Sequence, residues 1–97
     1  MDVNLKMPLA LEKEQVATLR FPAEEVLNSE EAIKARKEEL NKAMKLGNLE
    51  HGKIRIVFED TEGMKQVETT IWGVTDKRII LKQGLVIPIH RIHEIKI

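Results

Sequence analysis

Two histidines near the C-terminal end come nearest, by type and spacing, to a chemical site. His90 and His93 stand three positions apart, so a helical turn would place both rings on one side, where they could bind a metal ion. Glu94 or His51 would supply a third ligand. In a strand the two rings would point to opposite faces, and the sequence has no HExxH or comparable zinc spacing. We therefore expect no metal site, and a metal-dependent enzyme is kept only as a third alternative.

The remaining residues do not assemble into catalytic machinery. The chain has no cysteine, and its one serine, Ser29, is better placed to cap a helix than to act as a nucleophile. Neighbouring glutamates such as Glu24 and Glu25 would diverge by about 100° on a helix and would not converge on a substrate. The five glycines are scattered and form no phosphate-binding loop. The sequence thus predicts a protein that is not an enzyme and has no cofactor.

A surface of basic and aromatic side chains is the second candidate site. Lys and Arg number 16, as do Asp and Glu, and this zero net charge argues against a polyanion binder that acts through bulk charge. Residues 51–97 hold eight of the bases and six of the acids, so a local basic patch can still form there. The possible binding patch consists of Lys53, Arg55, Trp72, Lys77, Arg78, Lys82, His90, Arg91 and His93.

The elements that must position these residues change in kind near Gly52. Residues 53–97 hold fourteen of the valines and isoleucines, whereas residues 1–52 hold four. Because β-branched side chains fit the pleated surface of a sheet, the second half predicts strands. The first half predicts a helix and irregular chain.

The helix is predicted over residues 29–47, where Asn28 or Ser29 would cap its start and Gly47 would end it. Its apolar stripe is narrow, so the helix must lie on another element. That stripe consists of Ile33, Leu40 and Met44, with Ala32, Ala43 and Leu46 beside it. Residues 1–28 are predicted to be irregular, with one short helical turn at Pro22 to Glu25. Residues 16–21 fit either a strand or a helical turn.

Five short strands are predicted over residues 53–97. In the first, Ile54, Ile56 and Phe58 share one face of the strand. The charged residues Lys53, Arg55 and Glu59 share the other face. The second is long, and its apolar pattern changes phase at Gly73, which indicates a bulge or sharp bend.

The end of the chain gives two further signals. Pro88 cannot donate a backbone hydrogen bond, so its strand is predicted to leave one edge unpaired. The apolar period breaks at His90 and Arg91, which predicts a single helical turn before the last strand.

Short strands in this order favour closure into a small antiparallel barrel, since closure removes exposed strand edges. The predicted fold class is therefore α+β. An N-terminal helix packs on a small five-stranded antiparallel SH3-like or Sm-like β-barrel, and residues 1–97 form a single domain.

Part of this pattern resembles the bacterial RNA-chaperone branch of the Sm family. In that branch a glycine in the bent second strand is followed by an aspartate and then by an apolar run ending in Leu-Lys. Gly73, Asp76 and residues 79–82 are similar to that pattern. Residues 89–92 place a histidine and a base where the family has Lys-His. The resemblance implies binding of RNA or other single-stranded nucleic acid.

A rival resemblance covers residues 73–81 and 87–92, which look like a phrase common in bacterial pleckstrin-homology-like and GRAM-like domains. We place this resemblance second.

The leading prediction for function is a non-catalytic interaction module. Its apolar last residues, 95–97, would form an edge strand that could pair with another copy, so a homo-oligomer is expected. The alternative is an Sm-like RNA-binding protein. The chain lacks the ~18 consecutive apolar residues of a membrane span and the features of a signal peptide at Met1, so we expect a cytoplasmic protein without a membrane partner.

Overall fold

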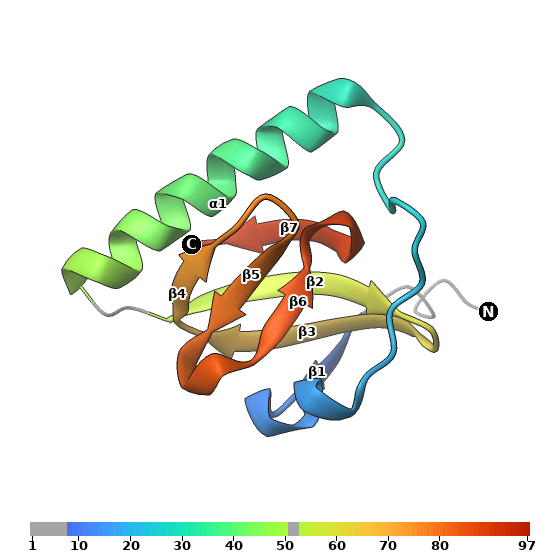
Figure 1. The fold of residues 1–97 in the computed structure, drawn as a ribbon, viewed down its shortest axis with the longest axis horizontal. Coiled ribbons are helices and arrows are strands. Elements are labelled where there is room, and N and C mark those ends of the chain that lie inside the picture. The colour runs from blue at the N-terminus through green and yellow to red at the C-terminus, as the bar shows by residue number, and fades with distance from the viewer. Residues whose placement is uncertain (1–7, 51–52) are drawn as a thin grey trace.

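The computed structural model describes residues 8–50 and 53–97, with the backbone alone for residues 47–50. Within these residues the chain forms seven strands, one α-helix and three 3-10 helices (Figure 1). In chain order these are β1 (Leu9–Leu11), η2 (Lys13–Thr18), α1 (Glu30–Glu50), β2 (Ile54–Asp60), β3 (Gly63–Thr69), β4 (Ile71–Val74), β5 (Arg78–Leu81), η3 (Lys82–Gly84), β6 (Val86–Pro88), η4 (Ile89–Arg91) and β7 (Ile92–Lys96).

The strands form two separate sheets. The first has the order β1-β3-β2-β7, in which β2 pairs antiparallel with both β3 and β7. Strand β1 joins β3 in parallel, with Leu9 opposite Lys65. The second sheet has the order β4-β5-β6, and both of its pairings are antiparallel. The chain passes from one sheet to the other at Thr70, between β3 and β4.

The predicted barrel is therefore wrong, because neither sheet closes on itself. In the described part of the chain, β1 and β7 are the edges of the first sheet, and β4 and β6 are the edges of the second. Helix α1 contacts β4 and β7, whereas η2 contacts β3 and β6. Side-chain packing by these two helices thus joins the sheets where a barrel would use backbone hydrogen bonds.

An N-terminal helix was predicted, but the helix is not the first element of the described chain. Strand β1 and helix η2 precede it, and the short helical turn predicted at residues 22–25 lies instead at Lys13–Thr18. Ser29 caps α1, since its Oγ accepts the N–H of Ala32 at 3.1 Å. The helix continues past the predicted stop at Gly47.

One core lies between the two sheets and α1. Its apolar members are each at most 6% exposed, and burial of such a side chain contributes about 1.5–3 kcal/mol. They are Val16, Leu40, Ala43, Ile54, Ile56, Phe58, Val67, Ile71, Ile79, Leu81, Ile87, Ile92 and Ile95. In the first strand of the β half, Ile54, Ile56 and Phe58 are buried and Arg55 is exposed, as predicted. Val57 is also buried, so the alternation does not extend along the whole strand.

The buried face of α1 differs from the predicted stripe. Ile33 is 37% exposed, whereas Arg36 is 5% exposed and lies in one row with Leu40 and Ala43. An arginine, rather than an isoleucine, therefore faces the sheets near the start of the helix.

Other local predictions agree with the structure. The bulge lies one position before Gly73, because the pairing of β4 with β5 shifts between Ile71 and Gly73 and leaves Trp72 as the extra residue. Pro88 is on an edge strand, and the single helical turn is η4.

The turn between β2 and β3 contains a buried ion pair. Asp60 Oδ1 accepts the N–H groups of Glu62 and Gly63 at 2.9 and 3.1 Å, and Lys65 Nζ at 3.0 Å. Gly63 has a φ of 133°, a conformation that favours glycine. Burial raises the pKa of Asp60, but the hydrogen bond from Lys65 and those from the turn outweigh it, so the pKa lies below its ordinary value.

A second buried arginine ties the chain before α1 to the sheets. Arg91 is 6% exposed; its Nε donates to the carbonyl of Glu59 at 3.0 Å and its Nη1 to that of Glu24 at 2.7 Å. Its Nη2 lies 3.7 Å from Glu59 Oε2. Arg91 thus belongs to the fold, and is not available as a member of the predicted surface patch.

Replacement of this arginine by methionine should lower stability markedly. Arg91→Met leaves two carbonyls without their donor, so the free energy of unfolding should fall by about 2–4 kcal/mol. The control is Arg55→Met, because Arg55 is exposed and its pair with Glu68, at 3.7 Å, should contribute less than about 1 kcal/mol. Urea unfolding at pH 7 measures both, and equal losses would show that Arg91 does not have this role.

Candidate functional site

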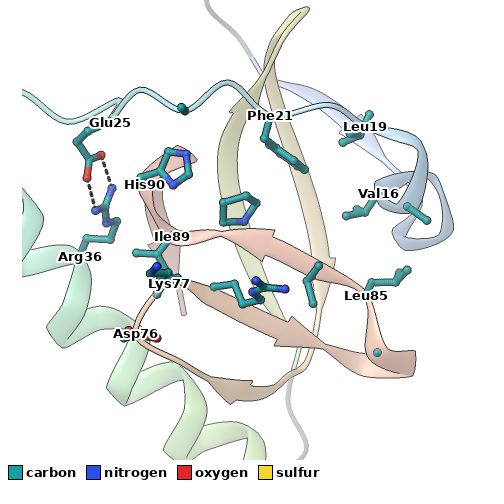
Figure 2. Close-up of a pocket in the computed structure, with 16 residues that line it drawn as sticks. Val16, Leu19, Phe21, Glu25, Arg36, Asp76, Lys77, Leu85, Ile89 and His90 are labelled. Carbon is teal, nitrogen blue, oxygen red and sulfur yellow. Dashed lines mark hydrogen bonds and ion pairs between the residues drawn. The ribbon is translucent and has the colours of Figure 1, made fainter.

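An open groove of about 1000 Å³ runs along strand β6 (Figure 2). Strand β6 and its flanking turns form one wall, and the chain from Val16 to Glu25 forms the other. Most of its lining side chains are apolar. The lining residues are Val16, Ala17, Leu19, Phe21, Ala23, Glu25, Arg36, Asp76, Lys77, Arg78, Gly84, Leu85, Val86, Pro88, Ile89 and His90.

The wall formed by β6 is an unpaired strand edge. Leu85 O accepts the N–H of Leu81 at 2.6 Å, and Ile89 N–H donates to Lys77 O at 2.9 Å. The backbone N–H and C=O groups of the odd-numbered residues of this strand therefore point toward β5. The backbone groups of Val86 and Pro88 therefore face away from β5. In the residues that the structure describes, β6 pairs with no strand other than β5. Val86 therefore offers one donor, its N–H, and one acceptor, its C=O, to the groove side. Pro88 has no N–H, and its C=O accepts the first hydrogen bond of η4.

The opposite wall is an extended segment whose alternate residues face the groove. Leu19, Phe21, Ala23 and Glu25 all line it, which is the period of two that an extended chain has. The Phe21 ring packs on that of Phe58 with a centroid distance of 6.0 Å, so this wall is attached to the core.

The segment is held to η4 at one end of the groove. Val26 N–H donates to His90 O at 2.9 Å, and His90 Nε2 lies 2.9 Å from Pro22 O. At the other end Val16 is buried in the core. Between these attachments the segment does not pair with β6, and this separation creates the groove.

An ion pair between the buried Arg36 and the partly exposed Glu25 closes the end of the groove near η4. Arg36 donates from Nη1 and Nη2 to the two carboxylate oxygens of Glu25, at 2.7 Å each, and from Nη1 to the carbonyl of Ile92 at 3.0 Å. The hydrogen bonds from Arg36 hold the pKa of Glu25 below its ordinary value, against the opposing effect of burial. Leu27 N–H also donates to this carboxylate, at 3.0 Å.

The two histidines of the predicted metal site have separate partners. His90 is bonded to Pro22, as above, and His93 Nε2 lies 2.9 Å from Glu59 Oε1. Among residues 8–50 and 53–97, the His, Asp and Glu side chains form no group of three that could hold a metal ion. His51 lies outside the described residues.

The structure divides the predicted binding patch. Lys77, Arg78 and His90 line the groove, whereas Lys53, Arg55 and Lys82 line a second cleft of about 420 Å³ beside β1 and β3. That cleft also contains acidic residues, Glu12, Glu14 and Glu68. Trp72 is 56% exposed and lines neither.

The apolar residues of the groove are not among the predicted site residues. Leu19, Phe21 and Ala23 alternate with polar residues or proline, and this period of two was the available signal. Residues 16–21 also fit a helical turn, so this period alone does not identify an extended wall.

Comparison with protein-family models, with curated proteins and with solved structures found no match. The assignment of the site therefore rests on its geometry.

In the described part of the chain, none of the helices is long and apolar enough to cross a membrane.

The Glu25–Arg36 pair should make stability depend on acidity. A lowered pKa in the folded state stabilises the fold at neutral pH, and this contribution is lost as the pH falls through that pKa, below the ordinary value of 4.5. Glu25→Gln should therefore be less stable than the wild type at pH 7, and the difference should shrink below pH 4.5.

Urea unfolding between pH 3 and pH 7 measures this difference. The matched control is Glu24→Gln, because the Glu24 side chain forms no hydrogen bond or ion pair with a described residue. A Glu25→Gln deficit that is constant across this range would contradict the prediction.

Proposed function

We propose that this chain is a non-catalytic interaction module that binds an extended stretch of polypeptide in the groove beside β6. The observation that carries the proposal is an unpaired strand edge in an apolar groove, with a second extended segment opposite. Addition of a strand to such an edge is a general mode of peptide recognition, in which backbone hydrogen bonds give affinity and side-chain pockets give specificity.

The groove offers two kinds of contact to such a peptide. Val86 can exchange two backbone hydrogen bonds with it, each with a net contribution of about 0.5–1.5 kcal/mol. Side chains that point inward would lie against Leu19 and Phe21, which supply the apolar area. Since β6 has only three residues, the bound stretch is short and we expect micromolar affinity, about 10–100 µM.

The lining side chains support a binding role over catalysis. Glu25 is occupied by Arg36, and the His90 ring nitrogen Nε2 is occupied by the carbonyl of Pro22. No serine, threonine or cysteine lines the groove to act as a nucleophile.

A residue that fills the groove should abolish this binding. Ala23 is exposed and lines the groove, so Ala23→Arg should fold normally and block the site. Ala35→Arg is the matched control, because Ala35 is exposed on α1 and lines neither the groove nor the second cleft. We expect a displayed library of random twelve-residue peptides to yield binders that shift the NMR amide signal of Val86. Their affinity should fall at least tenfold in Ala23→Arg and stay unchanged in Ala35→Arg.

Three outcomes would contradict the proposal. A selection without enriched binders, or with binders that ignore Ala23→Arg, would show that the groove is not the site. Binding of mixed RNA at low salt that Lys53→Glu and Lys82→Glu abolish would favour the nucleic-acid alternative. Light scattering that shows a stable dimer disrupted by Ala23→Arg would make a second copy of this chain the occupant.

A further inference from the structure

We infer that the groove selects peptides in which acidic residues precede alternating apolar residues. The inference rests on the proposed function and specifies its partner. It follows from the distribution of charge along the groove and from the direction of β6.

The two ends of the groove differ in chemistry (Figure 2). Val16, Leu19 and Leu85 lie together at the end where β6 begins. At the end where β6 stops, Arg78 is paired with Pro88 in the sheet and Lys77 lies opposite Ile89. One end is therefore apolar and the other basic.

The two bases at the second end are free to bind an anion. Lys77 and Arg78 are both exposed, and neither forms an ion pair with another residue of the described chain. Asp76 also lines the groove and offsets one of these charges, and the charges of Glu25 and Arg36 neutralise each other, so the groove has a net charge of +1.

The turn that carries these bases is ordered before any ligand binds. Thr75 Oγ1 accepts the N–H groups of Lys77 and Arg78 at 3.2 and 3.0 Å, and Thr75 N–H donates to Arg78 O at 2.8 Å. Little backbone entropy is therefore lost when an acidic side chain binds there.

The direction of β6 then fixes the order of residues in the peptide. An antiparallel strand pairs slightly better than a parallel one, and opposite Val86 a single peptide residue can both donate and accept. The N-terminal residues of such a peptide lie at the basic end of the groove, and its C-terminal residues lie at the apolar end. The peptide side chain opposite Pro88 lies in the same row as Pro88 and Arg78, so an acidic group there can reach the guanidinium across the proline ring.

The test uses four synthetic nine-residue peptides titrated by fluorescence anisotropy. The first has three aspartates followed by alternating valine and serine, and the second has the same residues in reverse order. In the third and fourth, lysine and serine respectively replace the aspartates. We expect the first to bind at least tenfold more tightly than the second and the third, with an advantage that shrinks as salt is raised.

Charge reversal of the protein should reverse this preference. The double variant Lys77→Glu, Arg78→Glu should bind the lysine peptide more tightly than the aspartate peptide. The matched control is Lys34→Glu, Lys37→Glu, which reverses two exposed charges on α1 outside both clefts and should leave the preference unchanged.

The outcomes separate this inference from the proposed function. If all four peptides bind equally well and Ala23→Arg abolishes binding, the groove is a peptide site and the inferred charge order is wrong. If the forward and reversed aspartate peptides bind equally, the antiparallel direction is wrong. If none of the four binds, the inference is overturned, and the library selection alone decides the proposed function.

Discussion

The position of the chain before α1 depends on one buried guanidinium. Arg36 is only 5% exposed, and its guanidinium binds both the Glu25 carboxylate and the carbonyl of Ile92. Three separate segments therefore meet at one charge. A buried cation without a carboxylate would be costly, and this cost prevents the segment around Glu25 from leaving. Arg91 has a similar role at the neighbouring residue, Glu24, because it donates to the carbonyls of Glu24 and Glu59.

The groove is a consequence of where these attachments lie. The segment is fixed at η4 and in the core at Val16, but along β6 only Val86 has free backbone groups to pair with, because Pro88 offers no N–H and β6 is only three residues long. A longer edge with all of its donors would favour direct pairing with residues 19–25, and the groove would close. The proline that marks an edge in the sequence therefore also helps to keep that edge accessible.

Local elements could be predicted from the sequence, but their closure into a fold could not. The alternation from Ile54 to Phe58, the cap at Ser29 and the turn at η4 each depend on neighbours within a few residues. Whether two sheets join into a barrel depends on what packs at their edges. The sequence alone predicts Arg36 as a solvent-exposed helix residue, because its partner Glu25 lies in an irregular segment that the sequence does not place. The groove was invisible for the same reason, since its walls are distant in sequence.

The parallel pairing of β1 with β3 has a consequence for the way the protein is made. Leu9 pairs with Lys65, which is synthesised 56 positions later, so at a translation rate of ~5–20 residues per second β1 waits roughly 3–11 s for its partner. During that interval the backbone N–H and C=O groups of Leu9–Leu11 have no partner strand. The first strand of the chain therefore joins the sheet only after the hairpin of β2 and β3 has been synthesised.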